Sequence, residues 1–195
     1  MFITVHGIDG SGKTTATSLL AESLRAQGSS AATFDDLEEA RGGDYPPLPD
    51  ELLAEAGSHP SIVKKMQQSQ VIRAAIAGGM DIVKDRWLID VYASNEYKGA
   101  SLPTPPASIV RPDLSVILVC AEETRRERII GRGNPTPDDL IPKEPGTRAA
   151  FFESYLINNI GAFAAKSAII DTTELGGGQT AARIMTDIEG IRRAG

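Results

Sequence analysis

Short apolar runs alternate with longer amphipathic segments along most of the chain, and this pattern predicts a mixture of strands and helices. Residues 114–120 form the clearest buried strand, because seven nearly uninterrupted apolar positions suit a strand that is covered on both faces. Weaker patterns predict further strands at residues 2–6, 30–34, 80–84 and 168–171. The alternation of strands with helices predicts a three-layer α/β domain built on a parallel sheet.

The predicted helices lie between these strands, and several carry an apolar stripe at helical spacing. They cover residues 14–27, 48–56, 61–77, 87–97, 121–130, 147–166 and 179–193. Three segments rich in Gly and Pro, or acidic and polar, are predicted as loops: 35–49, 98–112 and 131–146. The helix over 61–77 is expected to bury Ile62, Val63, Met66, Ile72 and Ile76.

The composition narrows the classes of function. The chain has 195 residues, which suits one domain, and its net charge of −6 argues against a nucleic acid polymer as partner. One cysteine and two histidines make a zinc site improbable. No apolar run approaches the roughly 20 residues that span a bilayer, and the N-terminus lacks the basic region of a signal peptide. A cytoplasmic location without membrane contact is therefore expected.

A glycine-rich segment follows the first predicted strand and leads into the first predicted helix. It fits the pattern G-x-x-x-x-G-K-[ST], whose backbone amides and helix N-terminus face phosphate oxygens. The lysine of this pattern reaches the β- and γ-phosphates of a nucleotide, and the hydroxyl that follows binds Mg²⁺. We therefore expect ATP and Mg²⁺ to be held by Gly7, Asp9, Gly10, Ser11, Gly12, Lys13, Thr14 and Thr15.

Asp85 and Arg86 directly follow the predicted strand 80–84, at the edge where ligands bind to parallel sheets. A carboxylate at this place can support Mg²⁺ or accept a proton, and a guanidinium can bind a phosphate with two N–H groups. We expect Thr14 and Asp85 at the metal, and Arg86 at the phosphate of the acceptor. Asp9 lies inside the loop, where a carboxylate beside bound phosphates is costly unless it binds a hydroxyl or a cation.

Arginines cluster on the helix predicted over 121–130 and just beyond it. Arg125, Arg128 and Arg132 are spaced to share one helical face. One interpretation is a solvated helix laced with salt bridges to the interleaved glutamates. The other is a lid, approximately residues 122–147, that closes and brings guanidinium groups onto the transferring phosphoryl group.

These motifs together resemble the thymidylate kinase family. Residues 5–15 look like its phosphate-binding loop, Asp85-Arg86-Trp87 is similar to its Asp-Arg-aromatic motif, and residues 111–114 resemble its Pro-Asp-Leu strand entry. The resemblance implies a sheet in the order 2-3-1-4-5, MgATP as donor, often a homodimer, and Asp9 near a sugar hydroxyl of the acceptor. Gly10 stands where one subtype has a catalytic arginine, so the resemblance favours the subtype whose lid supplies it.

The acceptor side departs from the family. The helix before Asp85 has no aromatic residue to stack on a base, Asp90 replaces a usual serine, the arginine-proline signature after strand two is missing, and residues 134–145 form an unusual insertion. Such differences suggest a different acceptor, although losing one stacking ring costs only about 0.5–1.5 kcal/mol. The residues expected to contact the acceptor are Asp9, Lys64, Gln67, Gln70, Arg73, Arg86, Asp90 and Asn95.

Three functions remain open from the sequence. The leading hypothesis is a kinase that transfers the γ-phosphoryl group of ATP to a nucleoside monophosphate, dTMP or a related phosphate-bearing molecule. In the second, a kinase of the same fold phosphorylates a hydroxyl of a nucleoside or metabolite, with Asp85 as general base. In the third, the chain is a nucleotide-dependent switch or binding module with no small acceptor.

Overall fold

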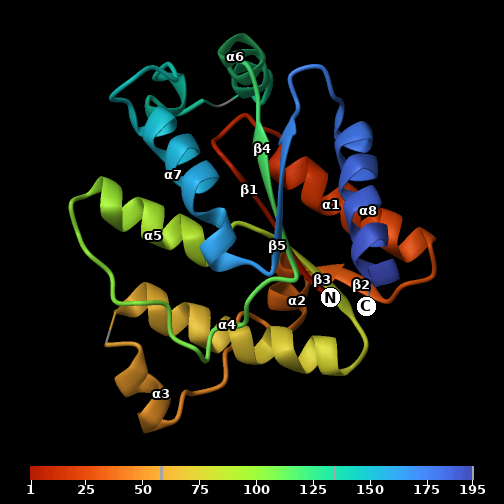
Figure 1. Ribbon diagram of the computed structural model, residues 1–195, viewed down its shortest axis with the longest axis vertical. Helices are drawn as coiled ribbons and strands as arrows, with labels where there is room; N and C mark the ends of the chain where they lie inside the picture. The colour runs from red at the N-terminus through yellow and green to blue at the C-terminus, as the bar shows by residue number, and fades with distance from the viewer. Residues whose placement is uncertain (58, 134, 195) are drawn as a thin grey trace.

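A five-stranded sheet forms the centre of the computed structural model, which describes residues 1–57, 59–133 and 135–194 (Figure 1). All neighbouring strands are parallel, in the order β2-β3-β1-β4-β5. The predicted α/β class and strand order are therefore confirmed. The strands are β1 (Phe2–Gly7), β2 (Ala31–Thr33), β3 (Asp81–Asp85), β4 (Leu114–Val119) and β5 (Lys166–Asp171).

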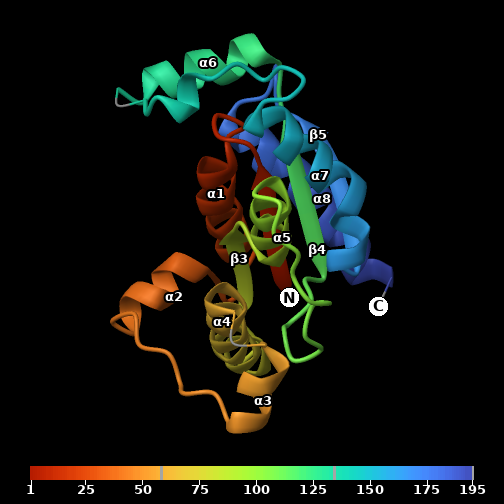
Figure 2. The same ribbon diagram turned by 90° about the vertical axis from the view of Figure 1, so that its left-hand side faces the viewer.

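Helices cover both faces of the sheet and give three layers. Helices α1 and α8 pack on one face, and α4, α5 and α7 pack on the other (Figures 1 and 2). Helix α6 lies above the carboxyl ends of the strands (Figure 2). The helices are α1 (Lys13–Ala26), α2 (Phe34–Ala40), α3 (Asp50–Glu55), α4 (Pro60–Ala77), α5 (Leu88–Tyr97), α6 (Glu122–Gly131), α7 (Arg148–Phe163) and α8 (Gly177–Ala194), with a 3₁₀ turn η1 (Asp138–Leu140).

Strand β1 is buried along its whole length, and alternate residues serve the two faces. Ile3 and Val5 pack in the core below α1 and α8, whereas Phe2 packs with Trp87 in the core below α4 and α5. Thr4 and His6 share the face of Phe2 but are polar, and both are fully or almost fully buried. These two residues therefore need hydrogen-bond partners inside the protein.

The predicted loop over 35–49 is wrong in its first part, where the chain forms α2. Phe34 is fully buried, and Thr33 and Asp36 form a capping box at the helix N-terminus. In that box the Asp36 amide donates to Thr33 Oγ1 at 3.1 Å, and the Thr33 amide donates to Asp36 at 3.2 Å. The signal was present in the sequence, but the acidic residues and the glycines that follow them obscured it.

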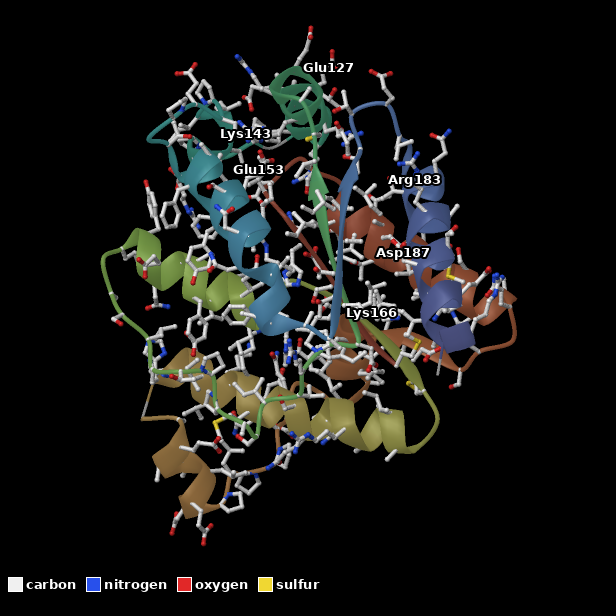
Figure 3. All side chains as sticks on the ribbon, in the orientation of Figure 1. Glu127, Lys143, Glu153, Lys166, Arg183 and Asp187 are labelled. Atoms are coloured by element: carbon white, nitrogen blue, oxygen red, sulfur yellow. The ribbon has the colours of Figure 1, made fainter. Side chains whose placement is uncertain are left out.

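The predicted loop over 131–146 begins at the last residue of α6, and beyond it the described residues 132–133 and 135–146 contain only the turn η1 as regular structure. Asn134, the first residue of the predicted insertion 134–145, lies outside the described residues. Lys143 fastens the later part of this segment, because its Nζ donates to the carbonyl of Cys120 at 2.8 Å and lies 2.9 Å from Glu153 on α7 (Figure 3).

Candidate active site

The glycine-rich segment links β1 to α1 at the carboxyl edge of the sheet. Gly10 and Gly12 have φ angles of 87° and 94°, in the region that only glycine adopts without strain. Gly12 is the N-cap of α1, so the first amides of this helix point out of the loop. The segment therefore has the concave backbone that sequence analysis expects for binding phosphates.

Lys13 begins α1 and folds back over this loop. Its Nζ donates to the carbonyl of Ile8 at 2.9 Å and lies 3.6 Å from Asp9 Oδ1, and only 6% of the side chain is exposed. Burial, followed by the positive charge of Arg86, lowers the pKa of Lys13. An anion bound in the loop would meet a cation that is already in place and poorly hydrated.

Thr14 and Asp85 meet beside the loop. The Thr14 hydroxyl donates to Asp85 Oδ2 at 2.7 Å, although the residues are far apart in sequence. The register that pairs Val5 with Asp85 brings the two strand ends together. Asp85 Oδ1 is buried and has no hydrogen-bond partner among the described residues. An unsatisfied carboxylate oxygen next to a hydroxyl fits Mg²⁺, which prefers oxygen ligands and keeps water and phosphate in its shell.

The described residues hold no group of three or more His, Cys, Asp or Glu side chains that could bind a metal by themselves. Mg²⁺ at Thr14 and Asp85 would therefore need the phosphates of a nucleotide and water to complete its coordination. This arrangement is normal for Mg²⁺ in nucleotide-binding sites, which rarely have dedicated protein cages.

Arg86 follows β3 and is held by two carboxylates. Its two terminal nitrogens donate to Asp9 Oδ1 at 2.7 Å and to Asp90 Oδ1 at 3.0 Å. Arg86 has a φ angle of 62°, the only positive value of a non-glycine residue in the described chain. Its backbone amide donates to Val5, so the arginine sits directly beside the glycine loop. Although burial acts in the opposite direction, Lys13 and Arg86 lower the pKa of Asp9.

A buried chain of polar groups supports Arg86 from below. Asp90 Oδ2 lies 2.6 Å from His6 Nδ1, and His6 Nε2 lies 2.8 Å from Thr4 Oγ1. Thr4 Oγ1 in turn lies 2.6 Å from Ser115 Oγ on β4. Despite burial, which would raise the value, His6 and Arg86 hold the pKa of Asp90 far below its usual range. These hydrogen bonds give the buried polar side chains of β1 their partners, and they fix the direction of the Arg86 guanidinium.

The arginines of α6 do not share one target. Arg125 is 2% exposed, binds both carboxylate oxygens of Glu122 at 2.7 and 3.0 Å, and donates to the carbonyls of Asp139 and Ile141. Arg128 donates to Thr172 Oγ1 at 3.0 Å and to backbone carbonyls in the segment between β5 and α8. Arg132 is exposed. Helical spacing predicts one shared face for the three arginines. Arg125 and Arg128 instead point to different hydrogen-bond acceptors near each of them.

Two cavities lie on opposite sides of the glycine loop. The first, of about 350 Å³, is bounded by the loop, the end of α6 and the segment between β5 and α8. The second, of about 390 Å³, is bounded by the start of the loop, Arg86, α5, η1 and α7. From the loop, the start of α1 and the arginines, the first cavity is lined by Gly10, Ser11, Gly12, Thr15, Arg128 and Arg132. The second is lined by the loop residues Ile8 and Asp9 and by Arg86, Arg125 and Arg148.

Several residues expected at the acceptor lie elsewhere. Lys64 and Gln67 line a separate surface hollow with Tyr45 and Leu53, and the Gln67 amide donates to Pro46. Gln70 and Arg73, also on α4, line neither cavity beside the loop. Lys64 and Arg73 are exposed, whereas Gln67 and Gln70 are half-buried.

On α5, the structure places Asp90 and Asn95 away from the open cavity. Asp90 is 9% exposed and its oxygens are taken by His6, Arg86 and the Trp87 amide, so it acts on Arg86 and has no room for a ligand. Asn95 donates to the carbonyl of Val91 in its own helix at 2.8 Å.

Sequence reasoning missed the side chains that α5 and α7 contribute to the second cavity, namely Ser94, Tyr97, Lys98, Arg148 and Phe152. Helix α7 follows η1 in sequence and packs on α5, which ends about fifty residues earlier. No local pattern predicts this contact. The only sequence signal for this wall was that two basic residues lie close to aromatic ones: Lys98 follows Tyr97, and Arg148 stands four residues before Phe152.

No helix in the described part of the chain is both long enough and apolar enough to cross a membrane.

Comparison with known proteins points to one family. No protein-family model matches the chain. A protein of Archaeoglobus fulgidus described as "Probable thymidylate kinase" is 26% identical over 165 residues, which cover 79% of this chain and 82% of that protein. A protein of Ectopseudomonas mendocina described as "Thymidylate kinase" is 28% identical over 214 aligned residues, covering 98% of this chain and 94% of that protein. The chain is thus similar, at low identity and over almost its full length, to thymidylate kinases.

Proposed function

We propose that the chain is an ATP-dependent kinase that transfers the γ-phosphoryl group to a nucleoside monophosphate, dTMP or a related phosphate-bearing molecule. One observation carries the proposal: the glycine loop separates two cavities, and each has cationic side chains beside the loop. Two ligands bound in these cavities would both border the loop over residues 8–12, which is the proximity that direct transfer requires. A switch or binding module would have no need of the second cavity.

The donor would bind in the cavity that contains Gly10 and Gly12. The loop amides and Lys13 Nζ would hold the β- and γ-phosphates and offset their charge. Thr14 and Asp85 would hold Mg²⁺, whose role is to bridge phosphate oxygens and stabilise the charge that develops on them. Breaking the Thr14–Asp85 hydrogen bond would free both oxygens for this task.

The acceptor would bind in the cavity that contains Asp9 and Arg86. An oxygen of its phosphate attacks the γ-phosphorus of ATP, the bond to the β-phosphate oxygen breaks, and ADP leaves without a covalent enzyme intermediate. Arg86 would orient the acceptor phosphate, and Asp9 would bind a sugar hydroxyl. Asp85 lines neither cavity and is bonded to Thr14, so its contacts give no support to a general-base role toward a hydroxyl acceptor.

The arginines of α6 would stabilise the transferring group, whose charge is spread over its equatorial oxygens. Arg128 and Arg132 border the donor cavity, and Arg125 borders the acceptor cavity. We include in the proposal a lid made of residues 122–147 and a homodimer, which the resemblance to thymidylate kinases suggests.

An ADP-forming assay over a panel of nucleosides and nucleoside monophosphates tests the proposal. We expect turnover with at least one monophosphate and none with Lys13→Ala. Turnover with nucleosides alone would transfer the assignment to hydroxyl phosphorylation. ATP binding without any phosphorylated product, seen by thermal shift, would replace the kinase with a binding module.

A further inference from the structure

The outer wall of the acceptor cavity is built by α5 and α7, and no described residue of α4 lines it. Tyr97 at the end of α5 and Phe152 on α7 lie 6.2 Å apart between ring centroids, and Phe151 lies 5.4 Å from Tyr97. Tyr97 is 44% exposed and lines the cavity, so part of its aromatic side chain is open to a ligand there. Aromatic faces of this kind stack on nucleobases and other planar heterocycles.

Arg148 adds a second planar surface to the same wall. Its guanidinium carbon lies 5.1 Å from the centroid of the Phe152 ring, so the ring supports the guanidinium from one side. The Arg148 side chain is 55% exposed, and its ion pair with Asp138 is long, at 3.7 Å, between two exposed groups. A pair of this kind contributes little stability and yields readily to a ligand.

Two aromatic rings near α4 are already covered, and a third, Tyr45, lines the separate hollow with Lys64, whose Nζ lies 6.0 Å from its ring centroid. Lys65 Nζ lies 4.7 Å from the centroid of Trp87, and Lys84 Nζ lies 4.1 Å from the centroid of Phe34. Trp87 and Phe34 are also buried in the core below α4. At this wall a planar ligand therefore finds an accessible ring at Tyr97 and a planar guanidinium at Arg148, and it finds no open ring at Trp87 or Phe34.

We propose, on the basis of the proposed function, that the acceptor carries a planar heterocycle that binds against Tyr97 and Arg148, between α5 and α7, and does not lie along α4. The acceptor phosphate then lies toward Arg86, and the ring lies at the outer wall of the same cavity. This placement explains how the chain can dispense with an aromatic residue on α4. It names the acceptor class as a nucleotide or another phosphorylated molecule with a planar ring.

The test compares dTMP, which has a ring, with ribose 5-phosphate, which has none. Tyr97→Ala and Arg148→Ala should each raise the Kd of dTMP, measured by calorimetry, about 10-fold. They should change the KM for ATP and the binding of ribose 5-phosphate by less than about twofold. Tyr97→Phe should bind dTMP like the unmodified chain, because the ring is retained. Tyr97→Ala also removes ring contacts with Phe151 and Phe152, so its thermal midpoint should fall, whereas Tyr97→Phe and Arg148→Ala should nearly keep it. Unchanged binding of ribose 5-phosphate then separates loss of the ring site from loss of the fold.

Two further variants act as controls. Arg183→Ala removes an exposed arginine from α8, on the opposite face of the sheet, and should leave dTMP binding unchanged (Figure 3). Lys64→Ala tests the α4 surface. Unchanged dTMP affinity in Tyr97→Ala and Arg148→Ala, or a larger loss in Lys64→Ala, would overturn the ring site. Failure of the proposed function gives a different result, because no monophosphate would then be phosphorylated, whereas dTMP binding would still locate the ring.

Discussion

His6 Nδ1 on β1 lies 2.6 Å from a carboxylate oxygen of Asp90 on α5, and both side chains are buried. The other oxygen of Asp90 accepts a hydrogen bond from Arg86. A histidine in the centre of the sheet therefore determines, through one carboxylate, where the guanidinium beside the glycine loop points. Neither His6 nor Asp90 lines a cavity, and we interpret both as residues that position Arg86.

Asp90→Asn should weaken acceptor binding more than it slows the chemical step. The neutral amide no longer pairs with Arg86 and His6, so we expect the KM for the acceptor to rise about 10-fold and the KM for ATP to stay unchanged. The loss of a buried charge partner should also lower the free energy of unfolding by about 3 kcal/mol. Steady-state kinetics that show equal changes in both KM values would contradict the positioning role.

The same variant has an expected pH signature. The folded-state pKa of Asp90 lies below the unfolded value of about 3.9, so the carboxylate stabilises the fold fully above that pH and progressively less below it. In denaturant titrations, the stability difference between the unmodified chain and Asp90→Asn should shrink as the pH falls below about 4. A stability difference that grows at low pH would show that the pKa of Asp90 is raised in the folded state and not lowered.

Lys65→Met should stabilise the protein at neutral pH. Burial, assisted by the charge of Lys84, lowers the pKa of Lys65 to about 8, whereas the unfolded chain has an ordinary value of 10.5. The charged form is therefore costly in the folded state below pH 8, and stability should rise between pH 8 and 10.5. We expect the free energy of unfolding of the variant to be about 1–3 kcal/mol higher at pH 7. In chemical denaturation, the variant should not show the rise in stability between pH 8 and 10.5. A less stable variant would mean that the contacts with Trp87 and Gln68 outweigh burial.

Gly10→Ala should push α6 away from the glycine loop. A Cβ atom at this position would lie 2.7 Å from Arg125 Cγ and 2.8 Å from the Arg125 carbonyl oxygen, so the helix backbone would have to shift. We expect the free energy of unfolding to fall by about 2–3 kcal/mol, and amide hydrogen exchange in α6 to become faster. Gly79→Ala is a matched control, because Gly79 has a similar φ angle of 83° and nothing within 4 Å of the added atom. Equal losses in both variants would assign the effect to backbone strain alone.

Arg125 and Arg132 should respond differently to truncation. Arg125 is buried and its side chain donates four hydrogen bonds, so Arg125→Ala should lower the thermal midpoint by several degrees. Arg132 is exposed at the cavity beside Gly10 and Gly12, and it makes no side-chain hydrogen bond within the described ranges. Arg132→Ala should therefore keep the thermal midpoint and lower kcat, by up to about 10³-fold if it contacts the transferring group. An unchanged kcat would leave Arg128 as the arginine to test.

Asp85→Asn should raise the Mg²⁺ concentration that gives half-maximal activity by about 10- to 100-fold, because the amide is a weaker ligand for a hard cation. ATP binding without Mg²⁺ should change little. A titration of activity with Mg²⁺ at fixed ATP checks this, and an unchanged midpoint would remove Asp85 from the metal site.

The fold could be predicted because its strands are short apolar runs separated by clear breaks. Even Val116 and Ile117, which face opposite sides of the sheet, belong to one continuous run. Helix α2 could not be predicted in this way, because its one buried residue, Phe34, gives no periodic pattern over seven residues. Its signal lies in the Thr33–Asp36 capping box, which is a local hydrogen-bond pattern.

The grouping of the residues that we propose to bind the donor was predictable, because most of them are contiguous in sequence. The loop, Lys13 and Thr14 follow one another, and Asp85 with Arg86 comes from the neighbouring strand. The cavity that we propose for the acceptor depends on how α5 and α7 pack. Lys64 and Tyr97 illustrate this difference. Lys64 lies at a separate hollow, whereas Tyr97 lines the cavity because α5 packs on α7, a contact that residue spacing does not predict.

Transfer of label from the γ-phosphate of ATP to an acceptor tests the central claim most directly. The purified chain is incubated with labelled ATP, Mg²⁺ and a set of nucleosides and nucleoside monophosphates, and the products are separated by chromatography. We predict that label appears in a nucleoside diphosphate, and that Lys13→Ala abolishes it. Label found only in a phosphorylated nucleoside hydroxyl, or only in inorganic phosphate, would contradict transfer to a monophosphate.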